Sequence, residues 1–189
     1  ACKALNVKKG DYVWTSAITF VASSNCALHC GAKIDFIDID SKTYNICPLK
    51  LKIKLIKSKK NGTLPKVIIV VHLAGNPCDM IKIYKLSKEF GFKIIEDASH
   101  AIGSYYNKHP IGSCKYSDIS VFSFHPVKIM TTGEGGMCTT NDLSTYNSMK
   151  RLTSHGVTRD PNEMTEVPHG PWYYQQIDLG YNFRMTEIR

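Results

Sequence analysis

The 189-residue sequence predicts an α/β fold built on a mostly parallel sheet. Segments typical of strands and of helices alternate at least three times, which is the pattern of strand–helix–strand units. The run from Lys66 to His72 is rich in β-branched residues and does not alternate apolar with polar positions. Such a run is typical of a strand buried on both faces, as in a parallel sheet. A chain of this length corresponds to about one domain.

The first third of the chain is expected to hold three helices and two strands. Gly31 suits the C-cap of the second helix, and Pro48 suits the first turn of the third. A turn at residues 9–11 precedes the first strand, and an acidic turn follows the second. The expected helices are 1–7, 21–30 and 48–57, and the expected strands are 12–15 and 33–37.

The rest of the chain continues the alternation. Gly75 and Pro77 end the buried strand, and Asp79 suits the N-cap of a helix that Gly91 ends. Asp142 suits the N-cap of a later helix. The expected helices are 80–90 and 143–154, and the expected strands are 66–72, 93–96, 118–124 and 136–140.

Composition and charge argue against several classes of protein. No apolar run approaches the roughly 20 residues that span a bilayer, and the first residues lack the pattern of a signal peptide, so a cytoplasmic protein is expected. The net charge of +8 could attract nucleic acid. However, the lysines concentrate in residues 50–60, where they alternate with Leu and Ile and no aromatic residue intervenes. One solvated helix face is the better interpretation of that pattern.

The seven cysteines form no regular framework and include no CxxC pair, which argues against a disulfide scaffold or a zinc knuckle. The closest group is Cys26, His29 and Cys30, on an expected helix. Small buried thiols are commoner than metal ligands in such a setting, so no metal is expected.

Polar residues follow the carboxyl ends of the expected strands, where parallel α/β sheets bind their ligands. Glu96 and Asp97 close one β-branched strand, and His100 comes three residues after Asp97. Ser123 lies near the end of another strand, Lys128 follows five residues later, and a glycine-rich turn comes next. These residues are the first candidates for a functional site.

A lysine and an aspartate at two strand ends suggest Schiff-base chemistry. An amine nucleophile has to be partly neutral, so it needs surroundings that lower its pKa. A carboxylate opposite a heterocyclic nitrogen keeps that nitrogen protonated and makes the ring an electron sink, as in enzymes that use pyridoxal phosphate (PLP). Lys128 and Asp97 fit this pattern. They also fit a surface lysine and a capping aspartate with no catalytic role.

Further motifs extend over nearly the whole chain from Tyr12 onward. They read TFVAS at 19–23, GA at 31–32, IDID at 37–40, VHLAGNP at 71–77, EDASHAIG at 96–103, FSFHPVK at 122–128, GEGG at 133–136, HG at 155–156 and LGYNFRM at 179–185. On these motifs the chain resembles the DegT/DnrJ/EryC1/StrS family of PLP-dependent sugar aminotransferases. The resemblance implies an aspartate-aminotransferase-like (fold type I) large domain, in which a mostly parallel sheet lies between two layers of helices.

The resemblance also implies roles for three residues around the cofactor ring. Lys128 matches the lysine that forms the Schiff base with PLP and then moves a proton. Asp97 matches the carboxylate that pairs with the ring nitrogen, whereas Glu96 is expected to point to the other face and serve structure. His100 matches the position beside the ring and its phenolic oxygen.

Four further residues match family positions at the edge of the cofactor. Phe20 matches the aromatic residue that stacks on the ring, and Thr19 supplies a hydroxyl nearby. Ser123 matches a donor to the cofactor phosphate. Asn182 matches a residue that reaches the phosphate of the partner subunit's cofactor, which implies a homodimer with shared active sites. No role is assigned to four neighbours of these motifs: His125, His155, Tyr181 and Arg184.

Within the family, FHPVK followed by TTGEGG, and the final LGYNFRMTEI, look most like the PseC branch. That branch makes UDP-4-amino-4,6-dideoxy-N-acetyl-β-L-altrosamine, a precursor of pseudaminic acid. The implied reaction is amination at C4 of a UDP-linked 4-keto-6-deoxy sugar, with glutamate as the usual amine donor. The keto position (C4 or C3), the nucleotide and the donor are not fixed by these residues.

The sequence departs from the family pattern at both ends. Family members carry a phosphate-binding turn at a helix N-terminus, ahead of the segment that residues 1–7 resemble, and a small C-terminal domain. Neither is found in residues 1–189, so a partial large domain is expected. The final residues, 185–189, carry no helix stop signal.

Several other readings stay open. Relatives that dehydrate sugars at C3 replace the Schiff-base lysine, typically by histidine, so Lys128 argues against that reaction. A non-catalytic regulator or scaffold would not need Asp97, Lys128 and Ser123 together. A sugar 3-aminotransferase also stays open, because these residues do not fix the position of the keto group. A nucleic-acid binder would show duplex affinity that falls with salt.

Overall fold

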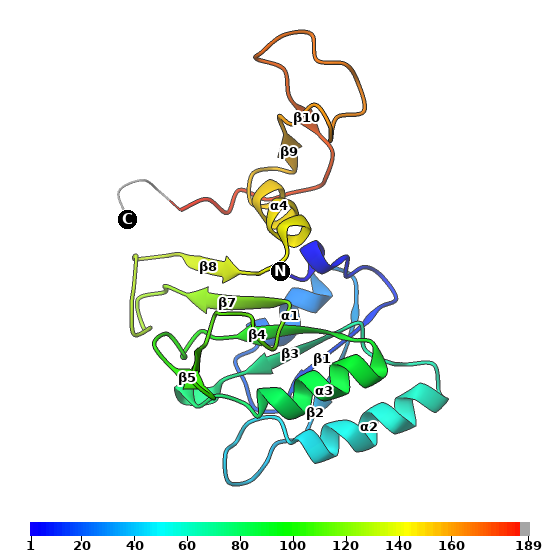
Figure 1. Ribbon diagram of the computed structural model, residues 1–189, viewed down its shortest axis with the longest axis vertical. Helices are drawn as coiled ribbons and strands as arrows, with labels where there is room; N and C mark the ends of the chain where they lie inside the picture. The colour runs from blue at the N-terminus through cyan, green and yellow to red at the C-terminus, as the bar shows by residue number, and fades with distance from the viewer. Residues whose placement is uncertain (186–189) are drawn as a thin grey trace. The chain divides into compact units, whose positions relative to one another are not determined.

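The computed structural model describes residues 1–185 and divides into two compact units, Ala1–Asn141 and the chain from Asp142 onward. The first unit confirms the predicted fold class, because a six-stranded sheet with flanking helices forms its centre (Figure 1). Within residues 1–185 no helix has the length and apolarity that crossing a membrane requires.

Five strands of this sheet are parallel and one is antiparallel. The strand order is β2-β1-β3-β4-β7-β8, and only β8 runs against its neighbour β7. The carboxyl ends of the five parallel strands therefore share one edge. The bounds are β1 Tyr12–Ser16, β2 Lys33–Ile37, β3 Val67–Val71, β4 Lys93–Asp97, β7 Ile119–Ser123 and β8 Gly136–Thr139.

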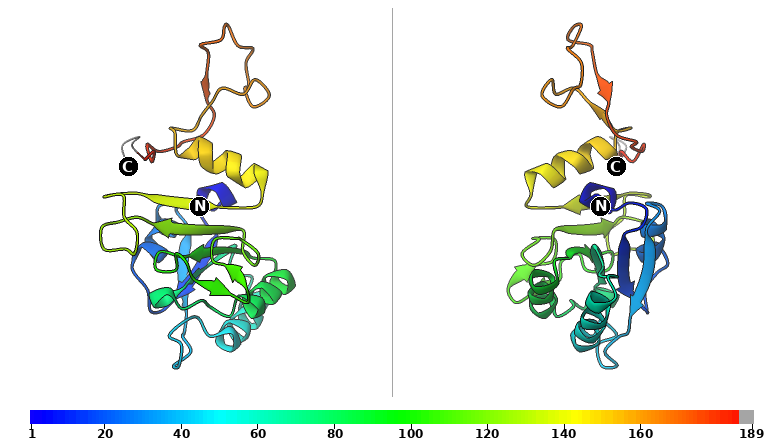
Figure 2. Two further views of the ribbon diagram at one scale, coloured as in Figure 1. Left: turned by 60° about the vertical axis from the view of Figure 1, so that its left-hand side comes forward. Right: turned by 90° about the vertical axis from the view of Figure 1, so that its right-hand side faces the viewer.

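Helices cover both faces of the sheet. Helix α1 (Ala22–Leu28) packs on β1 and β2, whereas α2 (Pro48–Lys60) and α3 (Met80–Phe90) pack side by side (Figure 2). Right-handed crossovers explain the division, since the connection through α1 runs in the opposite direction along the sheet from those through α2 and α3. A cluster of thirteen buried residues fills the space between the sheet and α2 and α3. Its members include Trp14, Leu51, Leu55, Ile68, Met80, Ile83 and Ile94.

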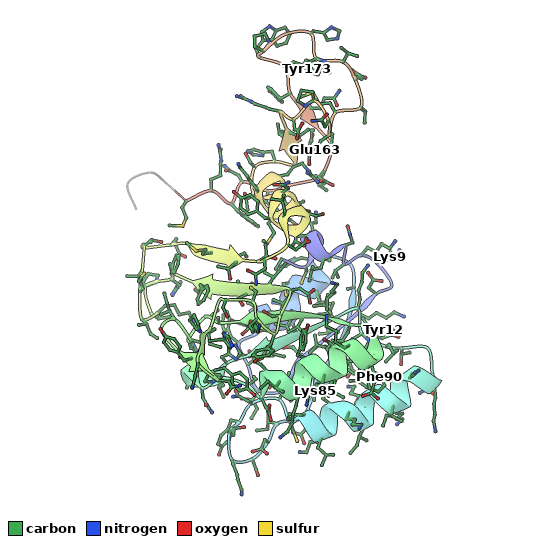
Figure 3. The ribbon with its side chains drawn as sticks, viewed as in Figure 1. Lys9, Tyr12, Lys85, Phe90, Glu163 and Tyr173 are labelled. Atoms are coloured by element: carbon green, nitrogen blue, oxygen red, sulfur yellow. The ribbon has the colours of Figure 1, made fainter. Side chains whose placement is uncertain are left out.

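Local chemistry sets the helix ends largely as predicted. Helix α3 spans the predicted residues, the Asp79 side chain accepts a hydrogen bond from the Lys82 amide at 3.4 Å, and Gly91 ends the helix at φ +79°. The lysines of α2 are mostly exposed, while its Leu51 and Leu55 are buried. Phe90, the last residue of α3, packs against the buried cluster, whereas Lys85 in the middle of the helix is exposed (Figure 3).

The predicted helix over residues 1–7 is wrong. Only a 3₁₀ turn, η1 (Lys3–Leu5), forms there, and Asn6 adopts a left-handed conformation at φ +57° that ends it. A helix this short forms too few hydrogen bonds to offset the cost of its first turn. The two-residue strands β5 (Tyr105–Tyr106) and β6 (His109–Pro110) are also absent from the prediction, as is the 3₁₀ turn η2 (Leu73–Gly75).

The described part of the second unit, residues 142–185, holds one helix and one short pair of strands. Helix α4 (Leu143–Leu152) begins at Asp142, whose side chain accepts a hydrogen bond from the Thr145 amide at 2.6 Å. The antiparallel strands β9 (Val157–Thr158) and β10 (Gln175–Gln176) were not predicted. Arg151 ties this unit together by ion pairs to Glu163 at 2.9 Å and Asp178 at 2.7 Å. Thr186–Arg189 of the sequence motif lie outside the described residues.

Candidate active site

The sheet brings six of the seven predicted site residues to one edge of the first unit. Thr19 and Phe20 follow β1, Asp97 ends β4, and Ser123 ends β7. His100 comes three residues after the end of β4, and Lys128 comes five residues after the end of β7. Residues that are far apart in sequence thus lie at one edge, because their strands are parallel members of one sheet.

Asp97 is held by hydroxyl groups from two directions. Its Oδ2 accepts a hydrogen bond from Ser23 Oγ at 2.7 Å, and its Oδ1 accepts bonds from Ser99 Oγ at 2.6 Å and the Ser99 amide at 3.2 Å. Thr19 Oγ1 lies 3.0 Å from Ser23 Oγ. A carboxylate has about four acceptor positions. The three bonds therefore fix its orientation and leave capacity for about one further donor.

Sequence reasoning missed Ser23 and Ser99. Ser23 lies in the first turn of α1 and is only 4% exposed, so its hydroxyl needs a partner inside the protein. The sequence did offer one signal for Ser23: it comes four residues after Thr19 near the start of a helix, and side chains at that spacing can contact each other. Ser99 lies two residues after Asp97. An aspartate side chain commonly accepts a hydrogen bond from the backbone amide two residues further on, so this spacing was also an available signal.

Lys128 and His100 form a second pair at the same edge. Lys128 Nζ donates a hydrogen bond to His100 Nε2 at 3.0 Å. A turn closed by the Lys128 amide and the His125 carbonyl at 2.9 Å carries the lysine. The Thr131 hydroxyl donates to the Phe124 carbonyl at 2.9 Å and closes the loop between β7 and β8. The lysine amine is thus partly exposed on a loop with defined internal bonds.

The backbone behind His100 leaves no room for a side chain at Gly75. A Cβ at Gly75 would lie 2.7 Å from the His100 carbonyl oxygen, and the residue adopts φ +81°. Glycine is required there on both counts. The Ser104 hydroxyl also donates to the Gly75 carbonyl at 2.9 Å. The turn after β3 therefore fixes the segment that carries His100.

A buried polar network lies behind Asp97. His72 is fully buried and Glu96 is 3% exposed. The Cys78 amide donates to His72 Nδ1 at 3.1 Å, so the ring carries its proton on Nε2, which donates to Glu96 Oε2 at 2.8 Å. Ser117 and Ser120 donate to Glu96 Oε1, the latter at 2.8 Å.

The pKa of Glu96 reflects this network. Burial raises the pKa, but the bonds from His72, Ser117 and Ser120 outweigh burial and hold the pKa below its ordinary value. Glu96 is therefore a structural carboxylate on the opposite face of β4 from Asp97, as expected.

Phe20, Ser123 and Asn182 have fewer interactions. The Phe20 side chain is 74% exposed at the start of α1. The Ser123 hydroxyl accepts the His125 amide at 3.4 Å and keeps its own proton available for donation. Asn182 belongs to the second unit, where its Oδ1 accepts bonds from Arg184 Nε and Nη2, both at 3.2 Å.

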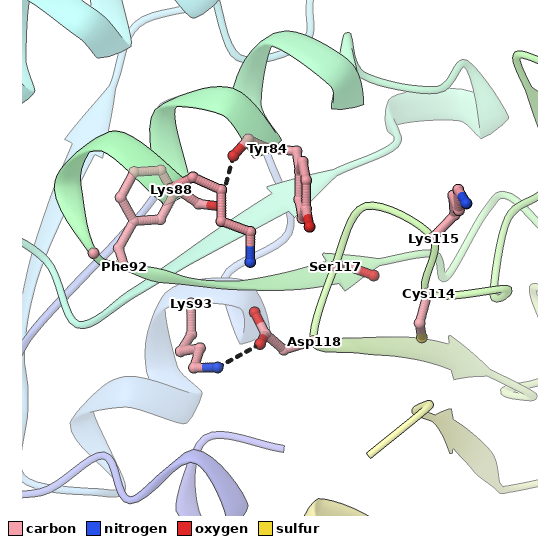
Figure 4. A pocket seen from close by; sticks show the side chains of 10 residues that line it. Tyr84, Lys88, Phe92, Lys93, Cys114, Lys115, Ser117 and Asp118 are labelled. Atoms are coloured by element: carbon pink, nitrogen blue, oxygen red, sulfur yellow. Dashed lines mark hydrogen bonds and ion pairs between the residues drawn. The ribbon is translucent and has the colours of Figure 1, made fainter.

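One cavity of the first unit lies away from this edge. A cavity of about 330 Å³ in the first unit opens at the amino ends of β4 and β7, and its lining includes Tyr84, Lys88 and the ion pair of Lys93 with Asp118 at 2.8 Å (Figure 4). That is the opposite edge of the sheet. Among residues 1–185, no group of three or more His, Cys, Asp or Glu side chains could hold a metal ion.

Comparison with solved structures gives the same fold. PseC of Helicobacter pylori, an aminotransferase involved in the biosynthesis of pseudaminic acid, matches with a TM-score of 0.77 and 32% identity over 95% of this chain and 44% of that one. The PLP form of the putative sugar aminotransferase Spr1654 of Streptococcus pneumoniae matches with a TM-score of 0.78 and 30% identity, covering 99% and 48%.

Curated sequences give the same family. The UDP-4-amino-4,6-dideoxy-N-acetyl-β-L-altrosamine transaminase of Campylobacter jejuni is 40% identical over 188 residues, which are 100% of this chain and 46% of the relative. The GDP-perosamine synthase of Escherichia coli O157:H7 is 35% identical with the same coverage. The chain thus spans about half the length of the relatives it matches. The family model for DegT/DnrJ/EryC1/StrS aminotransferases matches residues 1–189, and the chain therefore belongs to that family.

Proposed function

We propose that the protein aminates a nucleotide-linked 4-keto-6-deoxy sugar by PLP-dependent transamination, with a UDP-linked sugar as acceptor and glutamate as amine donor. The proposal rests on one observation: Lys128 and Asp97, each with its hydrogen-bond partners, follow or end neighbouring parallel strands at the ligand-binding edge of the sheet. The names of the Campylobacter and Helicobacter relatives support the UDP-linked substrate. The perosamine relative makes a GDP-linked sugar the alternative.

The residues at this edge fit PLP. Asp97 retains capacity for about one more donor, which a protonated ring nitrogen provides. Lys128 offers a primary amine, Phe20 an exposed aromatic face, and Ser123 a hydroxyl proton for the phosphate. When bound, PLP supplies an electron sink that stabilises negative charge on the amine-bearing carbon.

Each residue has a distinct action in this proposal. Ser23 and Ser99 orient the Asp97 carboxylate, which would pair with the ring nitrogen of the bound cofactor. Lys128 Nζ gives and takes the proton that moves during transamination, which is general acid–base catalysis by a positioned amine. His100 holds Lys128 Nζ in place, and Thr19 supports Ser23.

Two wider proposals follow from the family. Residues 1–189 form part of the cofactor-binding domain, and the protein is a homodimer in which Asn182 reaches the partner's cofactor. The exposure of Asn182 is compatible with that role.

Covalent trapping tests the proposal directly. After incubation of the full-length protein with PLP and reduction with borohydride, we expect a single pyridoxyl group on Lys128, located by digestion and mass spectrometry. Lys115, an exposed lysine at the opposite edge, is the internal control and should stay unlabelled. A folded protein with no label, or with label spread over surface lysines, would support the non-catalytic scaffold instead.

Ser23→Ala should weaken PLP binding by about 5- to 10-fold, since it removes one of the hydrogen bonds to a charged carboxylate. The matched control is Ser24→Ala, which removes the neighbouring hydroxyl of α1, bonded only to the Val21 carbonyl at 2.9 Å. Titration of PLP absorbance measures both dissociation constants. Equal effects of the two substitutions would show that Ser23 supports the helix rather than Asp97.

A further inference from the structure

Asn45 is a buried residue between β2 and α2, outside the set of residues that the proposed function uses. Only 3% of it is exposed. Its Nδ2 donates a hydrogen bond to the Asn76 carbonyl at 2.9 Å, and its Oδ1 accepts one from the Leu73 amide at 3.1 Å. Leu73 begins the turn η2, and Asn76 follows the turn. One side-chain amide therefore holds both ends of the turn after β3.

The turn η2 has a backbone conformation that needs such support. Two successive residues, Ala74 at φ +51° and Gly75 at φ +81°, are left-handed. Glycine adopts this conformation freely, whereas the Cβ of an alanine comes too close to the following carbonyl oxygen. Unfavourable conformations of this kind persist only where the surrounding structure holds them. The two hydrogen bonds from Asn45 hold the turn from outside.

The segment that carries His100 packs directly on this turn. A Cβ at Gly75 would lie 2.7 Å from the His100 carbonyl oxygen, so the two backbones are in close contact. The Ser104 hydroxyl donates to the Gly75 carbonyl at 2.9 Å and fixes the far end of the same segment. His100 Nε2 accepts the hydrogen bond from Lys128 Nζ at 3.0 Å. A continuous series of contacts thus leads from Asn45 to the lysine amine.

We propose that Asn45 is a positioning residue for Lys128, acting through the turn at residues 73–76 and through His100. The inference rests on the proposed function, in which Lys128 Nζ moves the proton of transamination. Such an amine has to stay within hydrogen-bond reach of the proton that it transfers. Release of the turn by Asn45 would let Gly75 and the His100 backbone shift together. The imidazole would then no longer meet the lysine amine.

Asn45→Asp is the sharpest test, because it keeps the size of the side chain and the acceptor for the Leu73 amide. It loses the Nδ2 donor, so a carboxylate oxygen faces the Asn76 carbonyl oxygen and that end of the turn is released. The full-length protein without cofactor is studied by NMR with ¹⁵N-labelled histidine, and His100→Gln identifies the His100 Nε2 signal. In Asn45→Asp this signal should move toward its position in Lys128→Ala, which lacks the amine donor.

The reaction rate provides a second measurement. Asn45→Asp should lower kcat for amination about 10-fold, because a small displacement of an acid–base group slows the chemical step. KM for the sugar should change less than ~2-fold, because the groups that bind the sugar are unchanged. A loss of stability alone would reduce the amount of active protein but would not move the His100 signal.

Two further variants complete the experiment. Ser104→Ala removes the hydrogen bond to Gly75 and should move the His100 signal in the same direction, so the test stays decisive if Asn45→Asp does not fold. The matched control is Asn141→Asp, which removes a side-chain amide bond to the Ser113 carbonyl at 2.9 Å. Asn141 follows the antiparallel strand β8 and so lies at the opposite edge of the sheet. This control should leave the signal and kcat unchanged.

The proposal is overturned if the His100 signal does not move in Ser104→Ala and in folded Asn45→Asp, or if Asn141→Asp moves it equally. It is also overturned if Asn45→Asp moves the signal and keeps the wild-type kcat. The NMR measurement needs no cofactor. A wild-type protein that takes no pyridoxyl label on Lys128 would therefore contradict the proposed function, whereas an unmoved signal contradicts the role of Asn45.

Discussion

The Lys128→Ala variant is expected to aminate a UDP-linked 4-keto-6-deoxy sugar about 10³-fold more slowly than the wild type, within the range for loss of a positioned acid–base group. The stability of the fold should change little, because Lys128 is partly exposed on the loop between β7 and β8. The rate is measured from the amino-sugar product with glutamate as donor. An external primary amine should restore part of the rate, since it supplies the missing functional group.

Lys115→Ala is the matched control for this experiment, and it should keep the wild-type rate. A Lys128→Ala rate above about a tenth of the wild-type value would contradict the proposed role of the lysine. Running the wild type with the GDP-linked sugar shows which nucleotide the protein prefers. If only the GDP-linked sugar reacts, the role of Lys128 stands and the UDP assignment is wrong.

His72→Leu should lower the free energy of unfolding by about 3 kcal/mol, because it leaves the buried Glu96 carboxylate without one of its partners. It also removes the acceptor for the Cys78 amide. Glu96→Gln should lower the free energy of unfolding by about 1–3 kcal/mol, because its NH2 group must replace one of two accepting oxygens and then faces a donor, either His72 Nε2 or the Ser117 and Ser120 hydroxyls. Denaturant titration of each variant measures the change.

Glu89→Gln on the exposed face of α3 is the control, with an expected change within about 0.5 kcal/mol. The pH dependence provides a separate check. Because the pKa of Glu96 is lowered in the folded state, its contribution is present above the unfolded pKa and is lost as pH falls through the folded value. The stability gap between wild type and Glu96→Gln should therefore shrink below about pH 4. A gap that does not change with pH would contradict an ionised Glu96.

The elements that the sequence predicts well are those with local signals. Helix α3 has a capping aspartate, an amphipathic pattern and a glycine at its end, and all three lie within a few residues. The buried run of β3 is equally clear. The segment 1–7 carries an apolar pattern but no cap, and there the prediction fails. The two-residue strands have no periodicity long enough to detect.

The candidate site shows the same limit. Asp97 and Lys128 are found because a strand end and a glycine-rich turn mark them in the sequence. Their partners are not, since Ser23 bonds to a residue of β4 and His72 to the neighbouring position on that strand. Such contacts depend on strand order, which no local pattern encodes. The family motifs identify the reactive groups, whereas the hydrogen bonds that orient these groups can be seen only in the structure.

The strand order also has a consequence for folding. Thr19 and Lys128 are separated by more than half of the chain, yet both belong to the edge formed by β1, β3, β4 and β7. Contacts between such distant segments form late, because the entropy cost of closing a long loop comes before the contacts can stabilise the chain. Ability to bind at this edge should therefore be the last property that a refolding chain regains, after its helices have formed. Cofactor capture would then report completion of the sheet more faithfully than helical content does.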